Sequence, residues 1–533
     1  MALSRDVETE TLDLTRAKLP WPQRVAASRG GIASAQHYRA TEAMVDVLGA
    51  GGNAIDAAVA GALALGVCEP AASGLGGQTM MIIYDAANNR TFFLDGSSRA
   101  PNRATPGALS SAQRVNGHTA TTVPSTLATL AYALEKYGTL SFAAVLAHAI
   151  ALAQGGFQVT ELLQRLIRRE SKNLRESAAA TLFLKDGARP PAVGSILRQP
   201  ALAATLQRLA RAGPKDFYTG QIARRIDDDM RANGGLLHKD DLAQIPWPIE
   251  RRPVSGRFRG LRVLTPPPPA SGRTLLQMLK IVEQLPERLQ RADTPEGAVA
   301  LAGVIRRANL DRRDRPFDPS FYAQIQEQRQ LSEEYAQLVA RELRQRLKAG
   351  GETTHLSVID RHGNTVGLTQ SIERVFGSCA ACPELGFLYN NYMSAFEYED
   401  IGHPYHLRPN AVPWASVAPT IVFKGRKPWL VIGSPGSERI ASSILQVLLR
   451  LDTQSPYDAV AAPRMHCSID GKVSLEASRM RSDIPDALRR SGFDVDEREP
   501  SSFYLGCVQL ALRERRELIG VADPRRDGAA GGP

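Results

Sequence analysis

A change of residue pattern near residue 350 constrains the fold of this 533-residue chain more than any other feature. Residues 326–348 form one charged, helix-like segment rich in Gln, Glu and Arg, and the pair Gly350-Gly351 is typical of a helix stop. Residues 355–360 and 365–372 then alternate as two strands, with a turn at 361–364 between them. The pattern therefore predicts a hairpin that begins directly after a flexible glycine pair.

The remaining segments predict strands and helices in blocks rather than a repeat. Hydrophobic residues make up 43% of the chain, which is enough for a substantial core. Residues 1–25 are interpreted as a loose leader, and 122–245 as mostly helical. The other expected helices are 40–48, 53–67, 275–283, 295–307 and 439–451, and the other expected strands are 79–85, 91–94, 416–423, 429–433, 503–512 and 516–523. Such blocks favour sheets covered by helices.

Charge and composition argue against several classes of partner. The net charge is +10, but the basic runs lack interleaved aromatic residues and any nucleic-acid motif, so no nucleic-acid partner is expected. The longest apolar run, residues 54–68, contains Asp56 and is too short to span a bilayer, so no membrane segment is expected. No signal peptide is recognised at the start, and the five cysteines are few and odd in number, which favours a reducing, cytoplasmic location. No motif predicts a metal or a cofactor.

Thr353 is the residue with the most distinctive chemical potential. A threonine hydroxyl is a weak nucleophile unless a base adjoins it. If the peptide bond between Glu352 and Thr353 breaks, the new α-amino group of Thr353 becomes that base. The alternative is that Thr353-Thr354 is β-branched strand filler, because such residues are common at strand starts.

Two further segments can be placed beside Thr353. If Asp360 faces Thr365 across the turn, Thr353 lies opposite Ile372 and beside Ser371, whose hydroxyl could then support the nucleophile. The loop at 433–440 joins a strand to a helix, and backbone N–H groups in such a loop can hold an oxyanion. Taken alone, this glycine-rich loop could also be an ordinary turn.

Several stretches, in this order, resemble the γ-glutamyltransferases (glutathione hydrolases) from about residue 25 to the end of the chain. The block Thr353-Thr354-His355 and the closing run at 522–530 are the most specific. The other matching stretches are 51–58, 74–77, 217–220, 234–237, 267–272, 390–393 and 433–437.

The resemblance implies an αββα sandwich made as one precursor that cleaves itself before Thr353. Residues 1–352 would become the large subunit and 353–533 the small one, each the partner of the other. Thr353 would attack a small amide substrate and form an acyl-enzyme that water or an amine resolves. The oxyanion donors would be Gly436 and Ser437, and the supporting hydroxyl would be Ser371.

The glutamyl-binding positions of the family are largely replaced. Ser97 stands at the position of the carboxylate-binding arginine, and Arg99 lies two residues away. At the other positions the chain has Glu373, Tyr392, Ala395 and, of a serine pair, only Ser416 beside Ala415. A serine does not replace a bidentate arginine, so an amide other than glutathione is favoured, as in the cephalosporin acylases. Two alternatives stay open: a true glutathione hydrolase in which Arg99 takes over, and an uncleaved homologue without activity.

Overall fold

The computed structural model describes residues 23–314, 332–342 and 353–533. Glu352 and most of the expected leader lie outside these residues, as do the two ends of the charged segment 326–348. Val25, assigned to the leader from the sequence, instead begins strand β1 (Val25–Ser28). The middle of the charged segment is the helix α13 (Glu333–Glu342).

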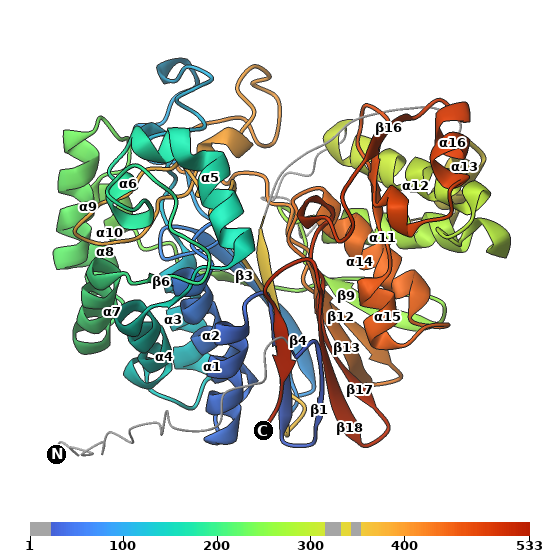
Figure 1. Ribbon diagram of the computed structural model, residues 1–533, viewed down its shortest axis with the longest axis horizontal. Helices are drawn as coiled ribbons and strands as arrows, with labels where there is room; N and C mark the ends of the chain where they lie inside the picture. The colour runs from blue at the N-terminus through green and yellow to red at the C-terminus, as the bar shows by residue number, and fades with distance from the viewer. Residues whose placement is uncertain (1–22, 315–331, 343–352) are drawn as a thin grey trace.

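Two seven-stranded antiparallel sheets form the centre of the molecule (Figure 1). The β10 sheet has the order β19 (Ala529–Gly531), β2 (Gly31–Ala35), β10 (Thr354–Asp360), β11 (Thr365–Ser371), β3 (Gln78–Asp85), β4 (Arg90–Gly96) and β7 (Ile249–Arg251). The β13 sheet has the order β1, β18 (Glu517–Ala522), β17 (Gln509–Glu514), β13 (Lys427–Gly433), β12 (Thr420–Lys424), β9 (Leu261–Thr265) and β8 (Val254–Phe258).

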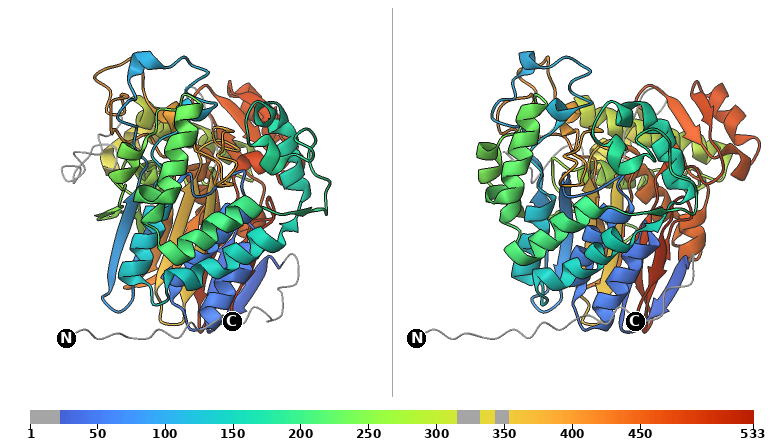
Figure 2. Two further views of the ribbon diagram at one scale, coloured as in Figure 1. Left: turned by 90° about the vertical axis from the view of Figure 1, so that its left-hand side faces the viewer. Right: turned by 60° about the vertical axis from the view of Figure 1, so that its left-hand side comes forward.

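Helices cover the outer face of each sheet, as the turned views in Figure 2 also show. On the β10 side they are α1 (Tyr38–Gly49), α2 (Ala54–Cys68), α3 (Thr126–Tyr137), α4 (Phe142–Gly155), α5 (Glu161–Arg175), α6 (Ala180–Phe183), α7 (Pro200–Ala212), α8 (Asp216–Thr219), α9 (Gln221–Ala232) and α10 (Lys239–Ala243). On the β13 side they are α11 (Gly272–Glu283), α12 (Pro295–Asp314), α13, α14 (Arg439–Arg450), α15 (Pro456–Ala461) and α16 (Ile484–Arg490).

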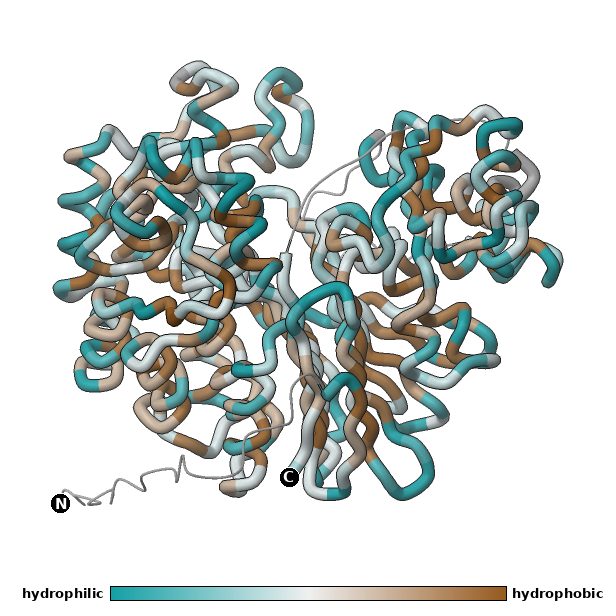
Figure 3. Tube along the Cα trace, in the orientation of Figure 1, coloured by the Kyte–Doolittle hydropathy of each residue, from teal (hydrophilic) through white to brown (hydrophobic). Residues whose placement is uncertain are grey.

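Three apolar cores separate the four layers. Leu356 and Val358 of β10 pack toward the helices α1 and α2, whereas Ile359 packs between the two sheets. This alternation follows from the pleat of a strand that is buried on both faces. A third core joins the β13 sheet to α11, α12 and α14. Figure 3 shows the apolar residues gathered along the strands and on the inner faces of the helices. The chain is therefore an α+β, four-layer αββα sandwich, as expected.

Two smaller sheets were not anticipated from the sequence. One consists of β14 (Met465–Cys467), β15 (Lys472–Leu475) and β16 (Asp494–Glu497), and it packs beside α16. The other is the pair β5 (Phe157–Gln158) and β6 (Ile196–Leu197) within the helical region. These strands have two to four residues, too few to give a period-2 signal against helical neighbours.

The expected register of the central hairpin is wrong by one residue. Ile359, and not Asp360, pairs with Thr365. The reason lies in the turn, where the Asp360 carboxylate accepts the N–H groups of His362 and Asn364 at 2.9 and 3.0 Å. Asp360 thereby faces Asn364, and its N–H donates to the Asn364 carbonyl. Closed by Asp360 and Asn364, the turn is one residue shorter than the sequence pattern indicates.

Both sheets combine strands from the two sides of residue 352. In the β10 sheet, β10, β11 and β19 follow that point, and β2, β3, β4 and β7 precede it. In the β13 sheet, β1, β8 and β9 precede it and the other four strands follow. Neither part of the chain contains all the strands of either seven-stranded sheet.

Candidate active site

Thr353 directly precedes β10 inside the β10 sheet, with 3% of its surface exposed. The register pairs Thr354 with Gln370, so one further step places Thr353 across from Ser371 itself. Thr353 shares the face of Ile359, which points into the space between the sheets. The corrected register thus brings Thr353 and Ser371 closer together than the sequence pattern suggested.

The next residue, Thr354, anchors the start of β10 on the opposite face. Its hydroxyl lies 2.6 Å from Glu69 and 2.9 Å from Gln36. Arg526 holds the same two side chains, at 2.9 Å from the Glu69 carboxylate and 3.0 Å from the Gln36 carbonyl oxygen. Arg526 belongs to the closing run that the sequence singled out, and Glu69 and Gln36 carry no sequence signal. Together they fix the backbone that presents Thr353.

His355 lies on the same face as Thr353 but is not suited to act as its base. Its ring nitrogens are 2.8 Å from the Thr369 hydroxyl and 3.0 Å from the Ser357 hydroxyl. Burial lowers the pKa of His355 to about 3, so the ring stays neutral at ordinary pH. Gly433, at the end of β13, packs directly on this ring, because a Cβ there would lie 2.2 Å from it. The loop after Gly433 therefore begins over the end of β10 that carries Thr353.

That loop has the backbone expected of an oxyanion-binding turn. Gly436 has φ +113° and Ser437 has φ +50°, the second being uncommon for a residue with a side chain. Arg439 N–H donates to the Gly436 carbonyl at 2.9 Å, which leads into α14. The Ser434 hydroxyl accepts the N–H of Cys507 at 3.1 Å and fixes the loop from behind. Turns of this kind at a helix start form concavities that bind anions.

Glu373 and Tyr392 lie beside Ser371. The Ser371 hydroxyl accepts the N–H of Glu373 at 2.8 Å, and the Tyr392 hydroxyl interacts with the side chains of Ser371 and Glu373. Burial raises the pKa of Glu373 to about 7, although Arg374, Arg312 and the Tyr392 hydroxyl oppose the shift. The carboxyl of Glu373 can therefore change its charge near neutral pH.

Ser416, the last of the expected site residues, lies beside Arg312, which sequence reasoning missed. The hydroxyls of Ser416 and Ser437 are 3.5 Å apart. Arg312, in the last turn of α12, donates to the Ser416 hydroxyl at 3.3 Å and to the Ala415 carbonyl at 2.7 Å. No local pattern marks Arg312, since the helix end and Ser416 are 104 residues apart.

The structure places Arg99 elsewhere. It lines a cavity of about 310 Å³ with Asp241, Trp247 and Asn410, and the lining contains none of the other predicted site residues. Ser97, at the position of the family's arginine, donates its hydroxyl to Asp95 at 2.6 Å. Substrate binding by Arg99 stays a prediction.

Comparison with known proteins places this chain in a family. The sequence profile named Gamma-glutamyltranspeptidase matches residues 40–532. The chain is 33% identical to the "Glutathione hydrolase proenzyme" of Bacillus subtilis strain 168, over 95% of this chain and 92% of the relative. It is 34% identical to the "Acylase ACY 1 proenzyme" of Pseudomonas sp. strain V22, over 97% and 95%. The chain belongs to the gamma-glutamyltranspeptidase family.

Solved structures agree with this assignment. Cephalosporin acylase from Bacillus halodurans superposes with a TM-score of 0.87 at 28% identity, covering 98% of this chain and 99% of the acylase. Gamma-glutamyltranspeptidase from Helicobacter pylori gives a TM-score of 0.53 at 30% identity, covering 58% and 90%. The fold is that of the N-terminal-nucleophile hydrolases, and the chain is an amide hydrolase and acyltransferase of this gamma-glutamyltranspeptidase-like class.

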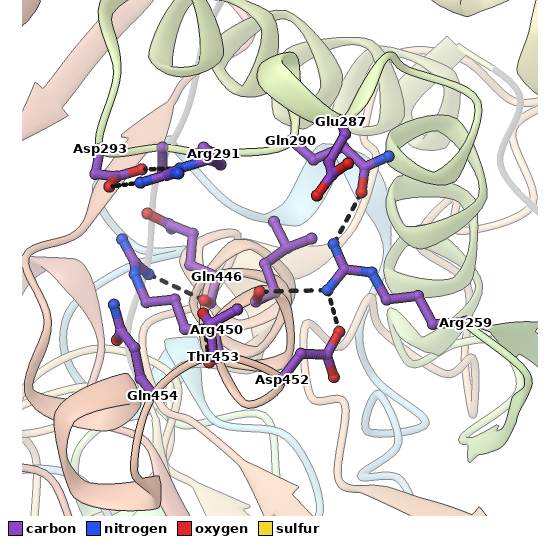
Figure 4. Close-up of a pocket in the computed structure, with 12 residues that line it drawn as sticks. Arg259, Glu287, Gln290, Arg291, Asp293, Gln446, Arg450, Asp452, Thr453 and Gln454 are labelled. Carbon is purple, nitrogen blue, oxygen red and sulfur yellow. Dashed lines mark hydrogen bonds and ion pairs between the residues drawn. The ribbon is translucent and has the colours of Figure 1, made fainter.

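Two further cavities lie in the described part of the molecule. One, of about 660 Å³, is lined from α5 by Arg165 and Arg169 and from the other side by Arg374, Arg439 and Arg498, among others. The other, of about 480 Å³, lies at the carboxyl end of α14 (Figure 4). Its charged groups are largely paired with one another: Arg259 contacts Asp452 and Gln290, and Arg291 contacts Asp293 at 2.8 Å. The 12-residue helix α14, about 18 Å long, separates this cavity from the Gly436–Ser437 turn.

The described residues contain no cluster of three or more His, Cys, Asp or Glu side chains that could hold a metal ion. Among the helices of the described ranges, none combines the length and apolar character needed to cross a membrane.

Proposed function

We propose that Thr353 is the nucleophile of this gamma-glutamyltranspeptidase-like enzyme and that the chain cleaves itself between Glu352 and Thr353. The observation that carries the proposal is the position of Thr353: it directly precedes β10, lies across from Ser371, and has the loop after Gly433 over its end of the strand. His355 is neutral and engaged with two hydroxyls, so the freed α-amino group of Thr353 is the base that fits.

In this mechanism the amino group takes the proton of the Thr353 hydroxyl as the oxygen attacks the amide carbonyl. The N–H groups of Gly436 and Ser437 stabilise the oxyanion, and the leaving amine takes the proton from the amino group. Water or a second amine then attacks the acyl-enzyme by the same route, which gives hydrolysis or transfer. Ser371 keeps the nucleophile oriented.

The substrate we propose is a small amide with a γ-glutamyl-like acyl group. Glu373 can supply a negative charge for an ammonium group, and Tyr392 fixes Glu373 by a hydrogen bond. A second candidate is glutathione itself, which the names of the curated relatives favour. We further propose a cytoplasmic location, which the free state of all five cysteines supports.

Denaturing electrophoresis tests the cleavage. The wild-type chain should give two bands, at about two-thirds and one-third of 57.8 kDa. N-terminal sequencing of the smaller band should begin at Thr353. Thr353→Ala should give one full-length band, and Thr353→Ser should still cleave because it keeps the hydroxyl. One full-length band from the wild type would refute the proposal.

A substrate panel tests the acyl group. The processed protein is assayed on a γ-glutamyl anilide, on glutathione and on simple aliphatic anilides. Turnover of the γ-glutamyl anilide without turnover of glutathione supports the first candidate, and comparable turnover of both supports the second. Turnover confined to the aliphatic anilides would contradict both.

A further inference from the structure

Ser97, which the sequence resemblance places at the carboxylate-binding position of the family, already has a partner. The Ser97 hydroxyl donates to Asp95, and Asp95 is paired with Arg251 at 2.7 Å. A substrate carboxylate at Ser97 would therefore meet a hydroxyl that already donates to Asp95, and a guanidinium that is already paired with the same carboxylate. If the acyl group carries a carboxylate, another cation has to bind it.

Arg312 is a cation beside the predicted site, and none of the ion pairs among the described residues includes it. It lies only partly exposed to solvent, and its hydrogen bonds go to the Ser416 hydroxyl and the Ala415 carbonyl, which are both neutral. Within the described ranges, no carboxylate lies within 4 Å of it. The nearest charged and titratable groups that act on it are Glu373, Glu438 and Tyr405. Buried or partly buried charges are normally paired, so a guanidinium without a counter-ion is suited to bind an anion.

The surroundings of Arg312 fix its direction. Its guanidinium carbon lies 5.0 Å from the centre of the Trp414 ring, and the Ala415 carbonyl holds one of its nitrogens. Another guanidinium nitrogen contacts the Ser416 hydroxyl, and this hydroxyl lies 3.5 Å from the hydroxyl of Ser437. Ser437 belongs to the loop that would hold the oxyanion. A carboxylate on Arg312 and Ser416 therefore lies on the same side of the site as the reacting carbonyl.

Burial lowers the pKa of Arg312, which shows that its charge is poorly solvated there. The pKa of an arginine is so high that the group remains protonated at any physiological pH. An anionic ligand would compensate for the lost solvation.

We propose that Arg312 and Ser416 bind a free carboxylate at the far end of the acyl group. The substrate class is then the amides of dicarboxylic acids, in which one carboxyl forms the scissile amide and the other stays ionised. This inference rests on the proposed role of Thr353 and names the residue that selects its acyl group. Arg312 comes from the helix before residue 352, so both parts of the chain contribute to the site.

The test compares acyl groups of matched length on the processed protein. Glutaryl and butyryl anilides differ mainly in the distal carboxylate. Wild-type kcat/KM should be higher for the glutaryl compound, and Arg312→Met should lower it by about 10- to 100-fold, the range for a lost charge-assisted hydrogen bond. The value for the butyryl compound should change less than threefold. Arg312→Lys should lie between the two because it keeps a point charge.

A binding measurement keeps the inference testable if turnover is too slow to follow. Isothermal titration of glutarate should give a dissociation constant at least tenfold larger for processed Arg312→Met than for the processed wild type. Butyrate should bind the wild type no more tightly than it binds Arg312→Met. Arg313→Met is the matched control, since Arg313 is the exposed neighbour on the same helix. The appearance of two bands on a denaturing gel shows that each variant folds and cleaves.

The outcomes separate the inference from the function on which it rests. Two bands, with equal losses on both anilides or equal glutarate binding in Arg312→Met and wild type, would refute the role of Arg312 and leave Thr353 untouched. A single wild-type band would refute the nucleophile, while glutarate binding that depends on Arg312 would still support the carboxylate site.

Discussion

At the scale of single residues, Glu373 is the group whose charge can change near neutral pH. Its pKa is raised to about 7 by burial, so the carboxyl is neutral below pH 7 and negative above it. The charged and titratable groups that face it are Arg312, Arg374 and Tyr392. Only the ionised form can bind an ammonium group, and binding of such substrates should therefore improve as pH rises.

We expect kcat/KM for a γ-glutamyl anilide to rise more steeply between about pH 6 and pH 8 than kcat/KM for a glutaryl anilide. The α-amino group of Thr353 titrates in the same range, but it affects both substrates equally, and their ratio isolates Glu373. Glu373→Gln should make the ratio independent of pH. Glu384→Gln, at an exposed position, is the matched control. A ratio that keeps its pH dependence in Glu373→Gln would assign it to another group.

At the scale of elements, the contact between β13 and β10 sets the position of the reacting groups. Gly433 packs on the His355 ring, and a Cβ at Gly433 would lie within 2.5 Å of three ring atoms. The ring cannot turn away, since both of its nitrogens are hydrogen-bonded to strand hydroxyls. The close approach of the two strands therefore depends on glycine at this position.

Gly433→Ala should destabilise the protein by about 1–3 kcal/mol, the usual cost of overpacking a core, and should slow self-cleavage because the loop is displaced. Chemical unfolding and the rate of appearance of the two bands measure these effects. Gly107→Ala is the control, because a Cβ there meets nothing within 4 Å. A Gly433→Ala protein as stable as Gly107→Ala would show that the strands can separate without loss.

Particular elements explain what the sequence could and could not predict. The strand after the glycine pair was predictable because Thr354–Asp360 is followed by a turn-forming stretch, and its pairing with β11 was expected. The register was wrong because the Asp360 side chain holds a turn that closes at Asn364, one residue before the expected Thr365. Arg312 was not predictable, since its link to Ser416 exists only after α12 packs against α11 and the segment before β12 comes beside it. Contacts between distant segments leave no local pattern.

At the scale of the whole molecule, the interleaved strands predict how the cleaved protein behaves. Each of the two seven-stranded sheets needs strands from both sides of residue 352, so the two parts should remain together after the proposed cleavage. The processed protein should elute from a sizing column as one particle of about 58 kDa at neutral pH. Separation into two species without denaturant would contradict the arrangement.

Refolding tests the same arrangement from the unfolded side. Recovery of the processed protein from denaturant should depend on protein concentration, because two chains have to meet. Recovery of uncleaved Thr353→Ala should not show this dependence in dilute solution. Activity cannot be used for the variant, so both recoveries are followed by circular dichroism and by the elution volume of the native particle.

The shared sheets also require that folding comes before the proposed cleavage. The uncut chain can search for its fold as one molecule, whereas the two products inherit a structure that neither can rebuild alone. If Thr353 is released as proposed, the lifetime of the native state is set by the rate of unfolding rather than by a folding equilibrium within one chain. The proposed cleavage therefore also makes unfolding harder to reverse. At low protein concentration, a processed molecule whose two parts have separated would not regain its function.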